Sequence, residues 1–584
     1  MKSNLRAEDM QKLKDVALGK DSADVLIRGG MLVNVYSGEL LNNWSVAIKG
    51  EWIAAAGQEL DYTCGKDTRI LDASGKVIAP GFIEAHTHLN NMYTPYEFLR
   101  YAMAGGTTTI ITECEEIIYN SGVKGVLQFL EACSNQPVKF YTTIPAPLNL
   151  GKSSYTMWPS VNRLKKLLHR DDVIGTGEAY WQIILGGNDY FTTLAEEALS
   201  LGKSIEGHAA GAHNEKLLAY VAHGIKSCHE AVSVEDVLER LRLGLFVMIR
   251  QGSIRQELEA VQNLKDLQID FSRISLVTDG MDPRDLVSLG YLETSVQKAI
   301  DLGFDLVRAI QMVTINPATH FRLDHFTGGI TPARQADIVV LPDKRHIKPD
   351  FVLSKGRVVA EQGKVTVEPR KTIYDLSGLT KITKPVSVSS LSIYAPNSGV
   401  NMVRIVDMVT DLVSREYVEA MPAYEGQLQP DSGRDILKLT LVSMKNKIAN
   451  AFIRGIGLKD GAVASSYLWE TYGILAVGTN DADMIQAVNR IIDHGGGIAV
   501  CARGSIRAEL PLPVAGLITD ICMEDLVQRL LSIQAEAEKL GCRFPDIFKT
   551  LSVLCTGAIP FIRITEDGLY DLKSGTIVDM FVSG

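Results

Sequence analysis

The residues with the clearest chemical potential in this chain are two histidines that lie one residue apart. His86 and His88 end the stretch VIAPGFIEAHTH, which begins as an apolar run. Because side chains alternate along a strand, both imidazoles would face the same side and could bind one metal ion. An isolated His-x-His pair is more often two surface or hydrogen-bonded histidines, so a metal site also requires partners elsewhere in the chain.

Four further residues of ligand type stand at the ends of later strand-like runs. Glu178 follows VIGTG, His208 ends SIEGH, His229 follows IKSC and Asp279 follows SLVT. Barrel enzymes carry their chemistry at the C-terminal ends of the strands, so these side chains would converge at one rim. Imidazole and carboxylate ligands suit hard or borderline divalent ions. The remaining histidines fall in predicted helices, loops or tails, and we expect structural roles for them.

The elements that must position these residues form a repeating pattern. Over 76–330, apolar strand-like runs alternate with helical stretches, as in TTTIITE followed by VLQFLEAC, and RISLVTDG followed by LETSVQKAIDLG. Continuous apolar strands followed by helices predict a parallel sheet that is covered on both faces. Six or more such units in roughly 250 residues fit a (β/α)₈ barrel. The predicted fold class is therefore α/β.

Segments of a different character flank the predicted barrel. Residues 1–75 contain an N-terminal helix and then short runs that alternate apolar and polar positions, which is typical of hairpin strands, and the same pattern returns over 331–376. We expect these two segments to form one small β-sandwich into which the barrel is inserted. Residues 377–399 are rich in Ser, Pro and Gly and form a predicted linker, followed by a mixed α/β domain over 400–584.

Composition restricts the partners and the location of the protein. The chain has 584 residues, 46% of them apolar, and a net charge of −10. This charge disfavours nucleic acid and anionic membranes as partners. We find no signal-peptide pattern and no run of eighteen apolar residues, so we expect a cytoplasmic protein. The 8 cysteines include no CxxC pair, which argues against a disulfide framework and a thiolate zinc site.

Longer stretches of the chain resemble a known family. The stretch PGFIEAHTH, followed by a strand-end Glu, a GHA histidine, a further His and a TD aspartate, is similar to the amidohydrolase superfamily. The stretches MYTPYEFLRYAMAGGTTTII, GHAAGAHNEKLLAYVAHGIKSCHE and AELPLPVAGLITD narrow the resemblance to bacterial adenine deaminases. The resemblance extends over residues 25–584, including the C-terminal domain.

The resemblance implies a dinuclear metal site with manganese, iron or zinc. It assigns His86, His88 and Asp279 to one ion, His208 and His229 to the other, and Glu178 to the bridge between them. Two cations that share a water lower its pKa, so that hydroxide exists at neutral pH. Asp279 would take the proton of the attacking hydroxide and deliver it to the leaving amine. Catalytic roles are therefore expected for Asp279, Glu178 and His229.

The predicted substrate pocket departs from the family pattern in its first loops. Adenine deaminases typically carry HIESSM where this chain has HLNNM, so that Asn90 and Asn91 replace a region with a carboxylate. The family's DPHEI is ECEEI here, which contributes Glu113, Glu115 and Glu116. We expect these five side chains to contact the substrate. The three glutamates could also bind a third ion or lie in a solvated loop.

Two further departures supply aromatic side chains. Tyr180 and Trp181 follow the predicted bridging glutamate, and Trp469 and Glu470 belong to WETYG, where relatives carry HDSHN. We expect these four residues to line the substrate pocket as well, although Tyr180 and Trp181 could instead pack the barrel mouth. Because the changes cluster in pocket loops while the metal ligands are kept, we expect a retained mechanism and a substrate that is not mainly adenine.

The predicted function is an aminohydrolase that releases ammonia from an adenine-like or other amino-substituted N-heterocycle by attack of metal-activated hydroxide. One alternative is adenine deaminase proper, which converts adenine to hypoxanthine. A cyclic-amide or N-acyl amidohydrolase is a second alternative, although those of the dihydroorotase kind generally bridge their metals with a carboxylated lysine, and this chain offers Glu178. A non-catalytic scaffold is least favoured because no ligand is lost. We expect a small heterocyclic substrate and a homo-oligomer, dimer or higher.

Overall fold

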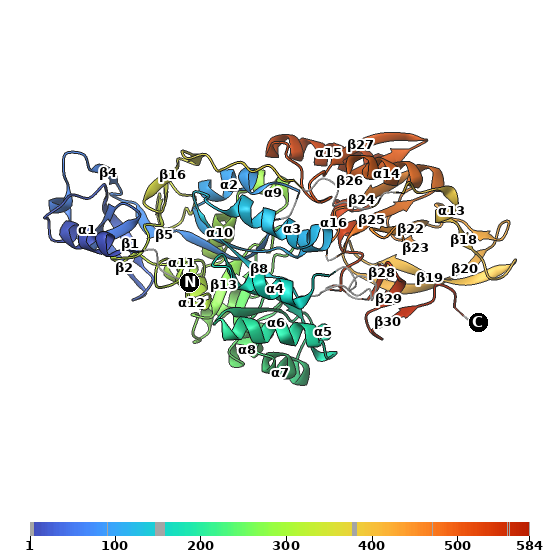
Figure 1. The fold of residues 1–584 in the computed structure, drawn as a ribbon, viewed down its shortest axis with the longest axis horizontal. Helices are drawn as coiled ribbons and strands as arrows, with labels where there is room; N and C mark the ends of the chain where they lie inside the picture. Colours follow the sequence, from blue (N-terminus) through green and yellow to red (C-terminus); the bar gives the residue numbers. More distant parts are fainter. Residues whose placement is uncertain are drawn as a thin grey trace.

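The computed structural model describes residues 5–89, 92–146, 158–375, 382, 384–469, 471–557, 559 and 561–582. Three regions lie side by side along the long axis of the molecule (Figure 1). A β-rich region lies at one end, the strand–helix repeats lie in the middle, and the C-terminal domain packs at the other end. Within the described ranges, no helix is both long and apolar enough to cross a membrane.

The middle region is built on two parallel sheets. The first has five strands in the order β10-β9-β8-β7-β6, and the second has three in the order β11-β12-β13. Their bounds are β6 Phe82–His88, β7 Thr107–Glu113, β8 Lys139–Ile144, β9 Val173–Tyr180, β10 Ser204–His208, β11 Ser227–Cys228, β12 Phe246–Arg250 and β13 Ile274–Val277. The amide of Lys226 donates to the carbonyl of Ile205, and the amide of Asp279 donates to that of His86. A backbone hydrogen bond therefore links the two sheets at each end, as a barrel requires.

Helices follow these strands and cover their outer faces. They are α2 Pro95–Ala104, α3 Glu115–Cys133, α4 Val161–Leu168, α5 Trp181–Leu185, α6 Asp189–Ser200, α7 Asn214–Ala222, α8 Val234–Arg242, α9 Pro283–Ser288, α10 Leu292–Asp301, α11 Leu306–Gln311 and α12 Ile315–His320. Every residue of β6, β7 and β9 is buried, because one face meets these helices and the other meets the interior. The continuous apolar character of the strands follows from this double burial.

The segments before and after the parallel sheets form one nine-stranded sheet. Its strands are β1 Val25–Asn34, β2 Glu39–Lys49, β3 Trp52–Gly57, β4 Arg69–Asp72, β5 Val77–Pro80, β14 Ile338–Leu341, β15 Phe351–Ser354, β16 Arg357–Glu361 and β17 Lys364–Val365, and α1 Ala7–Ala17 and the short 3₁₀ helix Asp61–Thr63 precede or join them. β5 and β14 pair antiparallel, with Ile338 opposite Pro80. Only Gly81 separates β5 from β6, so this sheet anchors the strand that carries the His-x-His pair.

The C-terminal domain is centred on an eight-stranded sheet with the order β20-β19-β23-β22-β25-β24-β26-β27. Its strands are β19 Val400–Met408, β20 Ser414–Pro422, β22 Ile436–Ser443, β23 Ile448–Arg454, β24 Ala462–Ser465, β25 Gly473–Gly478, β26 Gly497–Ala502 and β27 Ser505–Pro511. Shorter strands are β18 Ile393–Tyr394, β21 Gln427–Leu428, β28 Ile562–Thr565, β29 Gly568–Asp571 and β30 Thr576–Val578, and the helices are α13 Val388–Leu391, α14 Asp481–His494, α15 Met523–Lys539 and α16 Ile547–Ser552. Gly495 ends α14 with φ 71°, a left-handed conformation that suits glycine.

The C-terminal domain is held against the rim of the middle region that carries the ligand-type residues. The amide of Thr519 donates to the carbonyl of Met92 at 2.9 Å, and the amide of Met523 donates to Oε2 of Glu97 at 3.1 Å. Arg284 on α9 forms an ion pair with Asp546, which caps α16. These contacts fix the C-terminal domain over the ends of β6, β7 and β13, where the predicted site residues lie.

Candidate metal site

The structure brings the predicted metal ligands together in two adjoining groups. His86, His88 and Asp279 form one group, and Glu178, His208, His229 and an unpredicted fourth residue, Glu230, form the other. In each group one ligand atom per residue lies within 4.8 Å of the others, and every residue is buried. Buried groups of imidazoles and carboxylates are suited to a divalent metal ion.

One carboxylate connects the two groups. Oε1 of Glu178 lies 3.2 Å from Nε2 of His88, and Oε2 lies 3.2 Å from Nε2 of His229. Each oxygen therefore faces a histidine of a different group. The rings of His86 and His229 are stacked with their centroids 4.0 Å apart, so the two groups are in direct contact.

The first group depends on the backbone at two strand ends. The pairing of β6 with β7 is irregular between Glu84 and Thr87, just where the His-x-His pair begins. Asp279 follows β13 with φ 55°, a left-handed conformation that Asp tolerates better than most residues. Its Oδ1 lies 3.2 Å from Nε2 of His86 and 3.3 Å from Nε2 of His88. Asp279, which is distant in sequence from the two histidines, thereby contacts both of them.

The glutamates of the ECEEI stretch lie behind these histidines. Oε1 of Glu116 is 2.8 Å from Nδ1 of His88, and Oε1 of Glu115 is 3.1 Å from the same atom. Glu113 reaches His86, with 3.6 Å between its Oε1 and Nδ1, and its Oε2 accepts a hydrogen bond from the hydroxyl of Thr143. A carboxylate on the second nitrogen of a ligand histidine fixes the orientation and the tautomer of the ring. Glu115 and Glu116 also line the cavity at the site, whereas Glu113 is not among its lining residues.

An arginine that the sequence analysis did not single out contacts the catalytic aspartate candidate. Arg250 ends β12, and its guanidinium lies 3.1 Å from Oδ2 of Asp279. The same guanidinium binds both carboxylate oxygens of Glu257, at 2.8 and 2.9 Å. Arg250 is a charged residue at the end of the apolar run LFVMIR. A strand-end position of this kind identified the other site residues and could have identified Arg250 as well.

Glu230 was also missed, although it directly follows a predicted ligand. Its Oε1 lies 2.5 Å from Nε2 of His229 and 3.8 Å from Nε2 of His208. Its Oε2 accepts a hydrogen bond from the amide of Ala209 at 2.7 Å. An acidic residue next to a strand-end histidine was the available signal.

The electrostatics of the site differ between its ligands. Burial opposes protonation of His88 and His229, but the charges of neighbouring glutamates outweigh it and hold the pKa of both rings well above the usual range. Burial lowers the pKa of His86 and of His208, so these rings are neutral and can donate an electron pair. Burial opposes ionisation of Asp279, but hydrogen bonds from His86 and His88 and the charge of Arg250 outweigh it and hold the pKa of Asp279 well below its usual range. Burial raises the pKa of Glu113 to about 8, and the nearby charge of Glu178 contributes.

The cavity at the site has a volume of about 60 Å³, and the C-terminal domain closes it. Trp469, Val553 and Ile559 supply this wall. The indole of Trp469 stacks on the imidazole of His88, with ring centroids 5.8 Å apart and an interplanar angle of 16°. On the barrel side, the ring of Tyr180 lies 4.3 Å from that of His208. Flat rings therefore border the site from both regions of the molecule.

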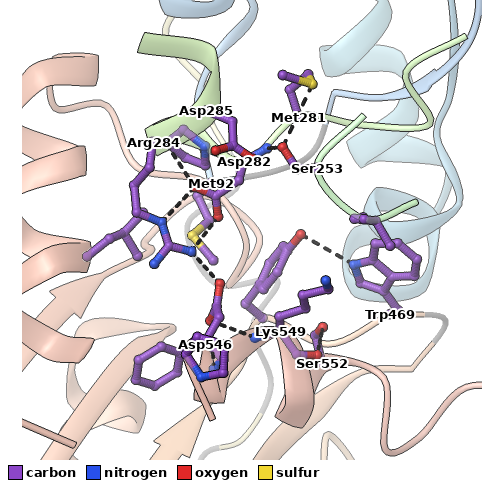
Figure 2. A pocket seen from close by; sticks show the side chains of 16 residues that line it. Met92, Ser253, Met281, Asp282, Arg284, Asp285, Trp469, Asp546, Lys549 and Ser552 are labelled. Atoms are coloured by element: carbon purple, nitrogen blue, oxygen red, sulfur yellow. Dashed lines mark hydrogen bonds and ion pairs between the residues drawn. The ribbon is translucent and has the colours of Figure 1, made fainter. Parts of the chain in front are cut away.

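A larger cavity of about 310 Å³ adjoins the site and shares Ile254 and Trp469 with it. Figure 2 shows Trp469 at one side of this cavity, with Arg284 and Asp546 paired across the other. The indole Nε1 of Trp469 donates to the hydroxyl of Tyr467 at 3.3 Å. Trp469 thus stands between the metal-ligand cluster and a wider space between the two regions.

The remaining sequence-predicted residues have different positions. Trp181 does not line the cavity at the site: its indole donates to the carbonyl of Ala210, and Nζ of Lys216 lies 4.9 Å from its ring centroid. The predictions for Asn90, Asn91 and Glu470 lie outside the described residues.

Comparison with known proteins first defines the class. A family model described as "Amidohydrolase family" matches residues 77–362, which include every predicted metal ligand. The match confirms the predicted fold class, and together with the buried ligand groups it identifies the chain as a metal-dependent hydrolase of carbon–nitrogen bonds.

The particular family follows from the C-terminal domain and from full-length relatives. A model described as "Adenine deaminase C-terminal domain" matches residues 411–576. An adenine deaminase of Moorella thermoacetica is 34% identical over 587 residues, covering 98% of both chains. An adenine deaminase of Kosmotoga olearia is 31% identical over 576 residues, covering 97% of this chain and 98% of the relative. The chain belongs to the adenine deaminase family, so the predicted family is confirmed.

Proposed function

We propose that the protein hydrolytically deaminates adenine or a closely related amino-substituted N-heterocycle and releases ammonia. The observation that carries this proposal is the position of Glu178, whose two oxygens face histidines of two separate ligand groups. A carboxylate in that position suits a bridge between two ions. The full-length similarity to proteins named adenine deaminase supports adenine as the first substrate to test.

The ligand groups fit two divalent ions of the manganese, iron or zinc type. His86, His88 and Asp279 would hold one ion, His208 and His229 would hold the second, and Glu178 would contact both. The donor atoms are imidazole nitrogens and carboxylate oxygens, which these ions accept. When bound, two such ions lower the pKa of a shared water, so that hydroxide forms near neutral pH.

Asp279 is the proposed proton carrier. Its Oδ1 faces the two histidines of the first group, while its Oδ2 accepts a hydrogen bond from Arg250. The low pKa of this carboxyl keeps it ionised and able to accept a proton. The oxygen of water bonds to the ring carbon that bears the amino group, Asp279 moves a proton from that oxygen to the amino nitrogen, and the carbon–nitrogen bond breaks. The products are a ring carbonyl and ammonia.

The cavity walls supply contacts for a planar ring. Trp469 lies parallel to His88, and Tyr180 lies against His208, so a flat heterocycle would enter between aromatic surfaces. Glu115 lines the same cavity, and its Oε2 is buried without a hydrogen-bond partner among the described residues. A ring N–H of the substrate would satisfy that oxygen, which otherwise carries the full cost of its burial.

The position of Glu115 favours a second candidate function, the deamination of a heterocycle other than adenine. In the family pattern the corresponding residue is a histidine, and a carboxylate selects for a ring donor instead. A site left with an unpaired buried polar group discriminates by a factor of about 10⁴. Substrate identity therefore depends on which ring nitrogens carry hydrogen.

Ammonia release by Mn²⁺- or Fe²⁺-loaded enzyme tests the proposal across adenine, other aminopurines, aminopyrimidines and cyclic amides. Adenine turnover with kcat/KM of about 10⁴ M⁻¹s⁻¹ or more would establish adenine as a substrate. Efficient turnover of a different amino-heterocycle would support the second candidate, and hydrolysis of cyclic amides alone would contradict both.

Substitution of the proton carrier tests its catalytic role. Asp279→Asn should reduce the deamination rate by at least about 10²-fold, because general acid–base catalysis contributes about 10²–10⁴-fold. Because Asp279 is also a proposed ligand of the first ion, the variant should bind that ion more weakly, so the rates are compared at Mn²⁺ concentrations that load both sites. Unchanged turnover of the variant would refute the assigned role.

Two predictions on assembly and location remain proposals. We propose a homo-oligomer. The apolar stretch LPLPVAGLITDICMEDLVQRLL that suggests it is largely buried within the chain itself, so light scattering of the purified protein, which measures its mass directly, decides the point. We propose a cytoplasmic location, which fractionation of the source cells would test.

A further inference from the structure

Glu230 is a buried carboxylate for which the proposed mechanism has no role. It follows β11 directly after His229, and 5% of its surface is exposed. One oxygen, Oε2, is fixed by the amide of Ala209 at 2.7 Å and by Sγ of Cys228 at 3.3 Å. The other oxygen, Oε1, accepts no hydrogen bond from any described residue. A carboxylate that is anchored by one oxygen and turned into a buried ligand group with the other is placed to contact a cation there, because a buried charge needs an opposite charge nearby.

The open oxygen converges on the second ligand group. It lies 2.5 Å from Nε2 of His229 and 3.8 Å from Nε2 of His208. Nε2 of His229 also faces Oε2 of Glu178 at 3.2 Å. Two carboxylate oxygens and the histidine nitrogens therefore point at one small buried space. Oε1 and Nε2 of His229 lie within ion-pair distance of each other, and a cation between the groups would take ligands from both.

Glu230 and Glu116 contact different nitrogens of their histidines, and this difference distinguishes a metal ligand from a residue that orients a ligand. Glu116 contacts Nδ1 of His88, whereas Nε2 of that ring faces Glu178 and Asp279. Glu116 thus occupies the side of the ring that points away from the ligand cluster, as outer partners of metal-bound histidines do. Glu230 contacts the nitrogen of His229 that points into the cluster. Its position is that of a residue in direct contact with the ion.

We propose that Glu230 is a further protein ligand of the second metal ion, beside Glu178, His208 and His229. This inference rests on the proposed dinuclear function. With two carboxylates and two imidazoles, that ion would have four protein ligands before any water binds. Zinc in catalytic sites commonly takes three protein ligands, whereas oxygen ligands suit manganese. The second position is therefore inferred to hold an ion of higher coordination number, with manganese and iron better suited than zinc.

Metal binding in the absence of substrate tests the inference. Glu230→Gln keeps the shape of the side chain but removes its charge. We expect the variant to bind its second Mn²⁺ more than about 100-fold more weakly, which exceeds the 10- to 100-fold cost of losing an outer partner. The first Mn²⁺ should bind as in the wild type. The readouts are equilibrium dialysis with metal analysis and the visible absorption of the Co²⁺ form, which should change toward a lower coordination number.

Glu206→Gln is a matched control. Glu206 is also buried and lies on β10, two residues before His208, but its carboxylate pairs with His320 and not with the ligand cluster. Its variant should bind two Mn²⁺ ions with wild-type affinity. If Glu230→Gln also binds two ions with wild-type affinity and leaves the Co²⁺ spectrum unchanged, the inference is wrong. A weakening within 10- to 100-fold and an unchanged spectrum would assign Glu230 as an outer partner instead.

The wild-type protein decides the question if Glu230→Gln does not fold. Its second site, loaded with Co²⁺, should show the weak absorption of a five-coordinate ion, and the intense absorption of a tetrahedral ion would overturn the inference. These measurements are independent of turnover. Loss of the second ion in Glu230→Gln would support the ligand role even if adenine is not deaminated, and normal metal binding would exclude it even if adenine is.

Discussion

Replacement of Trp469 by alanine should weaken substrate binding through the C-terminal wall of the site. Trp469 lines the cavity at the metal ligands and stacks on His88 with an interplanar angle of 16°. It is the aromatic residue that the C-terminal domain contributes to this cavity among the described residues. A planar substrate that enters the cavity would be expected to contact the indole face.

The size of the effect follows from the loss of one aromatic stacking partner. Stacking of a nucleobase on an aromatic side chain contributes about 1–3 kcal/mol by alanine substitution. Since about 1.4 kcal/mol corresponds to a tenfold change, KM should rise by about 5- to 150-fold. The turnover number should fall less, because Trp469 is not among the proposed ligands or proton carriers. Trp469→Phe should recover part of the loss, since a smaller aromatic face remains.

Trp181→Ala provides the matched control in a steady-state ammonia assay. Trp181→Ala removes the same side-chain volume as Trp469→Ala, but the indole of Trp181 contacts Ala210 and Lys216 and does not line the cavity. We expect the KM of this variant to change less than that of Trp469→Ala, because Trp181 reaches the cavity only through its hydrogen bond to the carbonyl of Ala210. Equal KM values for the two alanine variants would refute the placement of Trp469 against the substrate.

Two further predictions concern buried charges. Arg250→Gln removes the arginine that pairs with Glu257 and Asp279. Breaking a buried ion pair costs about 3–5 kcal/mol, so differential scanning calorimetry should record a Tm lower by about 6–20 °C. An unchanged Tm would contradict the pairing. Burial raises the pKa of Glu293 from 4.5 to about 7, so the folded state holds its proton more tightly than the unfolded state. The stability that this group contributes is complete below pH 4.5 and is lost as the pH rises through about 7. The Tm of Glu293→Gln should therefore decrease less over this range than that of the wild type. Parallel Tm curves would exclude the effect.

Local sequence patterns indicated most of the residues that the structure brings together in the two ligand groups, although Glu230 was missed. Alternation along β6 predicts that His86 and His88 face one side, and the convergence of parallel strand ends predicts that Glu178 and Asp279 meet them. The strands of 1–75 and 331–376 could be assigned to one unit because their alternating apolar and polar pattern stops before the predicted barrel and returns after it. These predictions depend on periodicity, which a single sequence displays directly.

Other features depend on side-chain direction and on contacts between distant segments. The three glutamates at the end of β7 and the start of α3 lie within four residues, but Glu113 reaches His86 while Glu116 reaches His88, and no pattern in ECEEI specifies this division. Tyr180 and Trp181 are neighbours, and only Tyr180 lines the cavity because the chain enters α5 at Trp181. The parallel stacking of Trp469 on His88 joins residues from separate domains, which sequence spacing cannot reveal.

The dependence of ammonia release on metal stoichiometry tests the central claim most directly. Metal-free protein titrated with Mn²⁺ should gain adenine-deaminating activity until two ions are bound per chain, because the two ligand groups meet at Glu178. Full activity at one ion per chain, or activity in protein shown to contain no metal, would contradict a dinuclear hydrolytic site.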